Sequence, residues 1–203
     1  MCRALTTAIV IPVHNAREYI ERTLRGMEVR GEATNPLVIV DDCSGDETAT
    51  LLREHEAAIR AGAFEAAWPR KFALLRNERQ QLFTRTVNRG LRYAYHNWQP
   101  DYIAVVNSDC DLKPWWLYNL ADALSRDDTL GLIGYTDNPD GKQPLVKKVK
   151  YPEYVTGHCL LLRVKMLEEV GVFCETDTDG SKSPELAHLK GLAHIGSDRV
   201  MSW

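Results

Sequence analysis

Short apolar runs alternate with amphipathic stretches along most of this 203-residue chain. The β-branched run at 7–11 comes first and is expected to stop at Pro12, because proline cannot continue a central strand. Ile20, Leu24 and Met27 then recur at the spacing of one helix face. In chain order, further strands are predicted over 37–40, 71–75, 102–106, 130–134 and 155–162, and further helices after 44, over 82–95, from Pro114 and over 165–170. This alternation predicts an α/β fold, with a mostly parallel sheet and helices on both faces.

The chain length suits one domain, which we expect to span residues 1–203. Hydrophobic residues make up 44% of the chain and charged residues 26%, which is typical of a globular protein and not of a disordered one. The formal net charge of −3 argues against a protein that binds nucleic acid through many phosphates. It leaves open the binding of a single nucleotide, where a metal ion supplies the positive charge.

The five cysteines are odd in number and none forms a C-x-x-C pair, so neither a disulfide framework nor a zinc site is indicated. This pattern favours a reducing compartment, and we expect a cytoplasmic location. No apolar run approaches the roughly 18 residues needed for a transmembrane span, and no signal-peptide core precedes the first strand. The basic residues Lys147, Lys148 and Lys150 indicate either a solvated patch or contact with an anionic acceptor or a membrane surface.

Three predicted strands end in polar clusters. Pro12 to Asn15 follow the first strand, Asp41 and Asp42 the second, and Asn107 to Asp109 the strand at 102–106. Because the carboxyl ends of parallel strands meet at one edge, these clusters are expected to lie together, where ligands bind in such folds. Neither phosphate-binding glycine motif, G-x-G-x-x-G after the first strand or G-x-x-x-x-G-K-[ST], is present. The G-x-S-x-G motif of serine hydrolases is absent as well.

The carboxylates in these clusters have candidate roles. Asp109 and Asp111 alternate past a buried strand, and their oxygens suit Mg²⁺ or Mn²⁺ with diphosphate oxygens completing the shell. The alternative is a turn capped by an Asx side chain before the helix at Pro114. Asp41 could accept a hydrogen bond from a nucleotide base or ribose, or could simply be a solvated loop residue near a helix start. Ser44 and Glu47 have the spacing of a capping box, in which both side chains cap the following helix.

Taken in order, these motifs resemble the family-two glycosyltransferases, which have the GT-A fold for binding nucleotide-diphospho-sugars. The matching segments are 8–15 (AIVIPVHN), 37–48 (LVIVDDCSGDET), 87–94 (VNRGLRYA), 101–109 (DYIAVVNSD), 114–117 (PWWL), 156–162 (TGHCLLL) and 170–173 (VGVF). The resemblance implies a Rossmann-like sheet with a nucleotide-binding half at about 1–112 and an acceptor-side half at about 113–203. It implies transfer of a sugar from a nucleotide-diphospho-sugar to a glycan or lipid-linked acceptor. The resemblance is also compatible with a homo-oligomer.

The resemblance assigns roles residue by residue. It places Pro12, Val13, Asn15, Asp41, Asn88, Asn107 and Ser108 at the donor, Gly157 and His158 on the acceptor side, and Asp109 with Asp111 at the metal. Asn107 replaces the first Asp of the family's Asp-x-Asp motif, as in rhamnosyltransferase-like members, which leaves Asp109 as the main ligand for Mn²⁺ or Mg²⁺. Asn88 matches an Asn-x-Gly motif that begins a helix beside the donor.

The resemblance also points to a catalytic base. The family's Glu-Asp pair has no direct counterpart, and Asp198, preceded by Ser197, is the best match. Its predicted task is to accept the proton of the acceptor hydroxyl in an inverting displacement. The alternative is a surface ion pair of Asp198 with Arg199 or Lys190. Two other functions stay open: a non-catalytic domain that binds sugar nucleotides, and a nucleotidyltransferase, which would need a glycine-rich basic loop after the first strand.

Overall fold

The structure, a computed structural model, describes residues 5–29, 35–63, 71–134, 158–173 and 175. Its elements, in chain order, are β1 (Thr7–Val13), α1 (Arg17–Val29), β2 (Leu37–Asp41), α2 (Thr48–Arg60), β3 (Phe72–Arg76), α3 (Leu82–Trp98), β4 (Tyr102–Val106), α4 (Trp116–Ser125), β5 (Leu132–Gly134), β6 (Cys159–Arg163) and α5 (Val164–Val170). The predicted strands and helices are confirmed to within a few residues wherever the chain is described.

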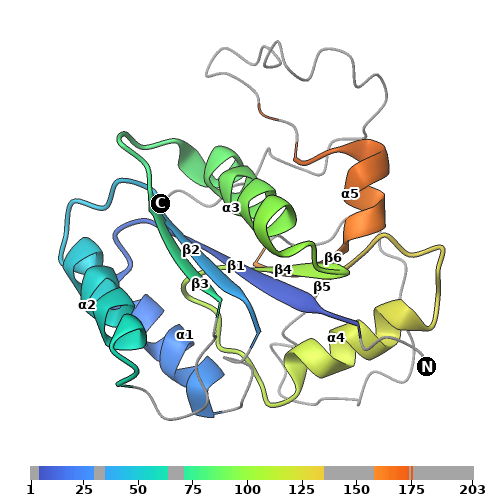
Figure 1. Cartoon of the computed structure of the whole chain (residues 1–203), viewed down its shortest axis with the longest axis horizontal. Helices are drawn as coiled ribbons and strands as arrows, with labels where there is room; N and C mark the ends of the chain where they lie inside the picture. The colour runs from blue at the N-terminus through green and yellow to red at the C-terminus, as the bar shows by residue number, and fades with distance from the viewer. Residues whose placement is uncertain (1–4, 30–34, 64–70, 135–157, 174, 176–203) are drawn as a thin grey trace, which may run out of the picture.

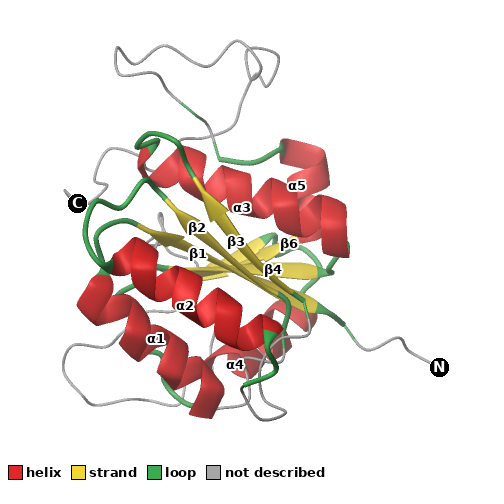
Figure 2. Cartoon of the chain, turned by 60° about the vertical axis from the view of Figure 1, so that its left-hand side comes forward, coloured by secondary structure: helices red, strands yellow, loops and turns green. Residues whose placement is uncertain are grey.

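Six strands form one sheet in the order β3-β2-β1-β4-β6-β5. The first four are mutually parallel, β6 is antiparallel to β4, and β5 is antiparallel to β6. Helices α1, α2 and α4 cover one face of the sheet, and α3 and α5 cover the other (Figures 1 and 2). This arrangement confirms the predicted α/β fold with a mostly parallel sheet.

Two apolar cores lie on the two faces of the sheet. The alternate β1 residues Ile9 and Ile11 pack with the α1 stripe Ile20, Leu24 and Met27, all of them fully buried. The intervening residues Ala8 and Val10 pack with Val87, Leu91 and Ala94 of α3 on the opposite face. The strands β1, β2 and β4 are buried over their whole length, as expected for parallel strands covered on both sides.

Helix α3 crosses the sheet at close range. A Cβ added to Gly90 would lie 2.4 Å from Val10 Cγ1 and 3.1 Å from Val40 Cγ2. Gly90 therefore allows α3 to approach β1 and β2 more closely than any side chain would. The first residues of α3 lie near the carboxyl ends of these strands, and the helix runs back along the sheet from there (Figure 1).

The expectation that the first strand stops at Pro12 is wrong, because β1 continues to Val13. The Ile9 N–H donates to Pro36 O on the β2 side, so the nitrogen of Pro12, three residues later, faces the other neighbour, β4. The pairing between β1 and β4 ends at Val10, so no ladder hydrogen bond needs an N–H at Pro12.

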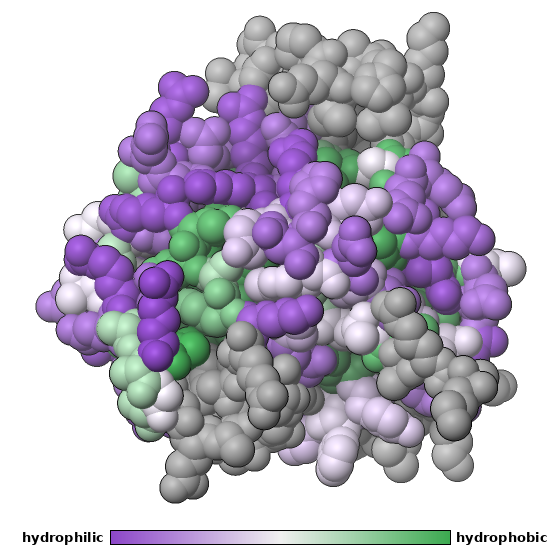
Figure 3. Space-filling model, viewed as in Figure 1, coloured by the Kyte–Doolittle hydropathy of each residue, from purple (hydrophilic) through white to green (hydrophobic). Residues whose placement is uncertain are grey.

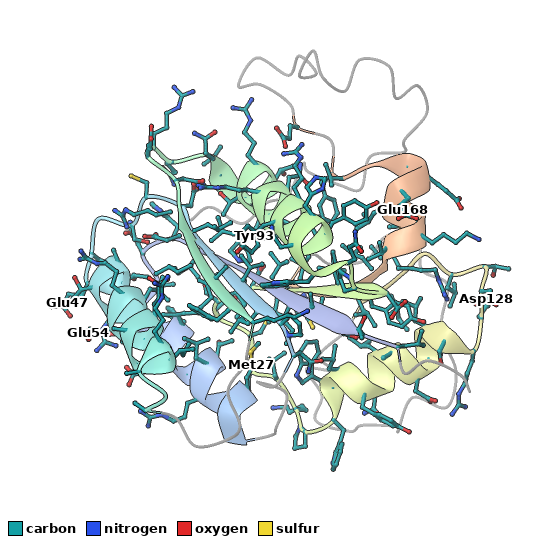
Figure 4. All side chains as sticks on the ribbon, viewed as in Figure 1. Met27, Glu47, Glu54, Tyr93, Asp128 and Glu168 are labelled. Carbon is teal, nitrogen blue, oxygen red and sulfur yellow. The ribbon has the colours of Figure 1, made fainter. Side chains whose placement is uncertain are left out.

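Two predicted helix starts are also wrong. Glu47 makes no capping hydrogen bond, and Asp46 Oδ1 instead accepts the Thr48 N–H at 2.9 Å. Glu47 points outward from α2, as does Glu54 (Figure 4). Helix α4 begins at Trp116 and not at Pro114, because Trp115 adopts a left-handed backbone with φ of 64°.

Among the described residues, no helix combines the length and apolar character that crossing a bilayer requires.

Candidate functional site

The carboxyl edge of the sheet, meaning the ends of β1, β2, β3 and β4 with the loops that follow them, brings the predicted site residues together. Val13 pairs in register with Asp41, and Asp41 pairs with Arg76, so these residues lie side by side on β1, β2 and β3. Pro12 and Val13 are buried within β1, which leaves them to act through backbone and shape. The polar residues of this edge come from the loops beyond.

The loops after β1 and β2 are joined by hydrogen bonds. The Asn15 N–H donates to Ser44 Oγ at 3.0 Å, and the Gly45 N–H donates to Asn15 Oδ1 at 2.8 Å. His14 Nδ1 lies 2.8 Å from the carbonyl oxygen of Asp42. Ser44 thus bonds to Asn15 across the edge, which explains why it does not cap α2. Asn15 is exposed and left-handed, with φ of 46°, the kind of strained residue that often marks a functional loop.

Asp41 is almost completely buried and its charge is compensated. Its Oδ2 forms an ion pair with Arg76 Nη1, and its Oδ1 accepts the Ser44 N–H at 2.9 Å. Arg76 also donates to the carbonyl oxygen of Ser44 at 2.9 Å, and nearly half of the Arg76 side chain is exposed. The guanidinium therefore presents a cationic surface at the carboxyl edge, backed by the Asp41 carboxylate.

Asp42 is also buried, and it fixes the start of α3. Its Oδ1 accepts the Asn77 side-chain amide and the Gln81 N–H, each at 2.7 Å. Its Oδ2 accepts the Leu82 N–H at 2.8 Å. Two free N–H groups at a helix start are satisfied in this way. Asp42 was not predicted as a capping residue, because its partners follow it by 35 to 40 positions in the sequence.

The segment after β4 carries the candidate metal ligands. The Asn107 N–H donates to the His158 carbonyl oxygen at 2.8 Å, which places the predicted acceptor-side His158 beside the metal motif. Ser108 is buried, and its carbonyl oxygen accepts the Thr23 hydroxyl at 2.8 Å. Asn107 Oδ1 is buried and has no hydrogen-bond partner among the described residues. An orphaned oxygen of this kind at a ligand edge is suited to bind a group that the chain itself does not supply.

The side chains at this motif offer oxygen ligands of the kind that a divalent cation takes. Asp109, two residues after Asn107, is exposed, and both residues offer the hard oxygen ligands that Mn²⁺ and Mg²⁺ take. Asp111 is exposed, with a carboxylate oxygen 2.6 Å from Lys113 Nζ, so its charge is partly neutralised. The described residues contain no group of three or more His, Cys, Asp or Glu side chains placed to hold a metal.

A cavity of about 440 Å³ adjoins the same edge, lined by Asn77, Glu78, Arg79, Gln81 and Arg89. Arg89 lies on α3 and donates to Asn77 Oδ1 at 2.5 Å and to the Arg76 carbonyl oxygen at 2.8 Å. Hydrophilic side chains gather in the upper left of the space-filling view, where Figure 1 draws the turn from β3 to α3 (Figure 3). All five lining residues are polar, and they include two arginines and one carboxylate, Glu78, which suits a ligand with hydrogen-bonding groups.

The side-chain contacts of Asn88 are with the segment after α5 and not with the carboxyl edge. It belongs to the second turn of α3, not to the helix start, and it is fully buried. Its Nδ2 donates to the Phe173 carbonyl oxygen and to Glu175 Oε1, each at 2.8 Å, and its Oδ1 accepts the Phe173 N–H at 3.0 Å. Gly157 and Asp198 lie outside the described residues.

The sequence reasoning missed Arg76, Arg89 and Glu175. Arg76 had a usable signal, since it directly follows the predicted third strand and parallel register places it beside the end of the second. Arg89 and Glu175 had none, because their partners are set by how α3 lies on the sheet.

Residues 8–171 match the family described as Glycosyl transferase family 2. A stretch of 49 residues is 37% identical to TuaG of Bacillus subtilis (strain 168), a protein described as a putative teichuronic acid biosynthesis glycosyltransferase; it covers 24% of this chain and 19% of that protein.

Two solved structures show the same fold. The mannosyltransferase PcManGT from Pyrobaculum calidifontis, in complex with GDP-Man and Mn²⁺, superposes with a TM-score of 0.64 at 16% identity, over 86% of this chain and 49% of that one. S. aureus TarS 1-349 in complex with UDP-GlcNAc superposes with a TM-score of 0.61 at 16% identity, over 84% and 49%. The chain spans about half the length of these solved relatives. With its sheet order, its strand-end motifs and the family match over most of its length, the chain belongs to glycosyl transferase family 2 and has the GT-A fold.

Proposed function

We propose that this protein transfers a sugar from a nucleotide-diphospho-sugar to a hydroxyl group of a glycan or lipid-linked acceptor. The observation that carries the proposal is the meeting of three strand-end clusters at one carboxyl edge. Hard oxygen ligands lie at the β4 end of this edge, and an arginine-lined cavity lies at the β3 end. A nucleoside diphosphate needs both features, because its phosphates require a cation and its base and ribose require hydrogen-bonding groups.

In this proposal, the nucleotide of the donor binds at the carboxyl edge of the sheet. Backbone groups at Pro12, Val13 and Asn15 border the nucleotide, and Asp41 takes part as a pair with Arg76. Support comes from two relatives of the same fold, which were solved with GDP-Man and with UDP-GlcNAc. Which base this chain prefers is a matter for the binding experiment below.

Asn107 and Asp109 are the proposed ligands of the metal ion. A bound Mn²⁺ or Mg²⁺ would neutralise charge on the departing diphosphate, which is the contribution of the ion to the reaction. Asn107 Oδ1 has the free lone pairs for this role, and the Asp109 carboxylate supplies the charge. Ser108 holds the turn between them through its buried carbonyl contact with Thr23.

The chemical step is a single displacement with inversion. Asp198 accepts the proton of the acceptor hydroxyl while that oxygen forms a bond to the anomeric carbon. The bond between the anomeric carbon and the diphosphate oxygen breaks with its electron pair, and the nucleoside diphosphate leaves. His158 and Gly157 border the acceptor in this scheme, and the backbone bond between the Asn107 N–H and the His158 carbonyl oxygen supports a place for His158 near the metal motif.

A non-catalytic sugar-nucleotide-binding domain is the second candidate. Two features favour it: Asn107 replaces a carboxylate of the family motif, and Asp111 is paired with Lys113. Both weaken the chain's own hold on a metal ion and so the assistance that the ion would give to the leaving group.

Calorimetric titration with UDP-, GDP- and dTDP-sugars, in Mn²⁺ and in EDTA, tests both candidates when combined with an assay for release of the nucleoside diphosphate. We expect tight binding of one nucleotide class and slow Mn²⁺-dependent release. Binding without release under any condition would favour the second candidate, and absence of binding would overturn both. An Asp198→Asn variant is expected to bind the donor normally and to lose release.

A further inference from the structure

One side of α3 holds the segment that follows α5. Arg85, Asn88 and Arg92 are spaced three and four residues apart, so their side chains share a face of the helix. Asn88 is fully buried there, and its amide forms a three-bond bridge to the backbone of Phe173 and to Glu175. Both hydrogens of the Asn88 amide are used in this bridge, so none is left to donate to a ligand.

Glu175 completes the arrangement. Its side chain is only 14% exposed, with Oε1 3.2 Å from Arg92 Nη2 and Oε2 3.8 Å from Arg85 Nε. A carboxylate at this depth needs charge compensation and hydrogen-bond donors, and α3 provides both. We call the group Arg85, Asn88, Arg92 and Glu175 the α3 clamp.

The same helix is fixed to the donor edge by other residues. Its first N–H group, at Leu82, is accepted by Asp42, and Arg89 donates to Asn77 and to the backbone of Arg76. Arg89 neighbours Asn88 in the sequence but points to the other side of the helix. Helix α3 is therefore bonded at one side to the strand ends and at another to residues 173 and 175.

We infer that Asn88 and Glu175 are positioning residues for the acceptor-side half, not donor ligands. The clamp fixes Phe173 and Glu175, which follow α5, relative to α3 and so holds this acceptor-side segment in one place with respect to the carboxyl edge. This inference rests on the proposed function. Misplacement of reacting groups by about 1 Å can lower a rate by roughly 100-fold, so loss of the clamp should reduce turnover more than donor affinity.

The test compares Asn88→Ala, Glu175→Ala and Glu175→Gln with the control Glu168→Ala. Glu168 on α5 also accepts a hydrogen bond from α3, from Tyr95 at 3.0 Å, but at the surface and outside the clamp (Figure 4). The measurements are the dissociation constants for UDP-GlcNAc and GDP-Man with Mn²⁺, the rate of nucleoside diphosphate release, and the exchange rate of the Phe173 amide hydrogen.

We expect Asn88→Ala and Glu175→Ala to slow release by about tenfold or more while the dissociation constant changes less than about twofold. Glu175→Gln keeps an oxygen that can accept from Asn88 and should recover part of the rate. Asn88→Ala should also speed exchange of the Phe173 amide, and Glu168→Ala should change none of the three quantities. A thermal unfolding curve for each variant checks that it folds.

Three results would overturn the inference: a weakening of donor binding that matches the fall in release, an equal fall for Glu168→Ala, or an unchanged Phe173 exchange rate in Asn88→Ala. If the wild-type protein binds neither nucleotide sugar, the donor assignment fails for these probes, while the exchange measurement still decides whether the clamp holds the segment at Phe173.

Discussion

The carboxylate of Asp42, the first residue after β2, accepts the backbone N–H of Leu82, the first residue of α3, at 2.8 Å. Leu82 is exposed and left-handed, with φ of 64°, a conformation that a leucine adopts only when its surroundings enforce it. Asp42 supplies that constraint by also accepting the Gln81 N–H and the Asn77 amide. The start of α3 is thus determined by a residue 40 positions earlier in the chain.

We predict that Asp42→Asn destabilises the fold by about 2 kcal/mol. Asparagine has one acceptor oxygen where Asp42 uses two, so at least one buried donor loses its partner. The midpoint of urea unfolding measures the change. The control is Glu47→Gln, because the Glu47 side chain is 87% exposed and makes no capping hydrogen bond. A shift of similar size in the control would show that the buried Asp42 bonds are not the cause.

We predict different effects for two glycine substitutions. Gly90→Ala should destabilise the protein by about 1–3 kcal/mol, because the new Cβ would overlap Val10 at 2.4 Å. Helix propensity alone would give a gain of about 1 kcal/mol, so the sign of the change identifies the contact with the sheet. At Gly45 an added Cβ would meet nothing within 4 Å, and Gly45→Ala is expected to be nearly neutral. Thermal denaturation of both variants checks the pair, and a stable Gly90→Ala protein would contradict the close approach.

We predict that Asp46 contributes to the acid sensitivity of the fold. Burial acts to raise the pKa of Asp46, but hydrogen bonds from the Thr48 hydroxyl and N–H, together with those from the backbone of Asp46 and Arg17, outweigh it, and the net pKa is lowered. Because the folded pKa is below the unfolded one, the stabilisation is present above the unfolded value, about 3.9, and is lost as pH falls through the folded pKa.

The variant Asp46→Asn keeps an oxygen that can cap Thr48 but removes this titration. Its urea midpoint should therefore fall less than that of the wild type as the pH is lowered from about 6 to about 2.5, a range that spans the carboxyl titration. Parallel curves for the two proteins over that range would contradict the assignment.

We predict that Asp109 and Asp111 differ in their importance for the reaction. Asp109→Ala should lower Mn²⁺-dependent release of nucleoside diphosphate by about 100-fold or more, because it removes the charged ligand beside Asn107. Asp111→Ala should change the rate by less than about threefold, since Lys113 already holds its carboxylate at 2.6 Å. Equal losses in the two variants would make Asp111 a ligand as well, and an unaffected Asp109→Ala would remove the proposed metal role.

The sequence allowed prediction of those features that depend on local periodicity. The stripe Ile20, Leu24 and Met27 faces the core, and β4 is buried over its whole length, as the apolar patterns indicated. The strand ends could be assigned to one edge because parallel strands share a direction. Residue contacts across that edge could not be predicted in the same way. Ser44 had the spacing of a helix cap, yet the Asn15 N–H takes its oxygen.

The long-range ion pairs had no signature at all. Glu175 meets Arg92 across 83 positions, and their contact depends on how α3 lies against the segment after α5. The close approach of α3 to the sheet, which Gly90 permits, is a matter of packing and not of any local motif. The contacts of Asn88 could not be predicted from its motif either, since its amide is directed to Phe173 and Glu175.

The place of β6 in the sheet determines when β4 becomes fully paired during synthesis of the chain. Strand β4 is paired on one side by β1 and on the other by β6, which begins at Cys159, far beyond the end of β4 at Val106. Until β6 arrives, the apolar residues of β4 would form an open sheet edge, which is a template for pairing with other chains. A shortened protein that ends soon after β4 is therefore expected to aggregate, although it contains every strand that borders the proposed nucleotide site.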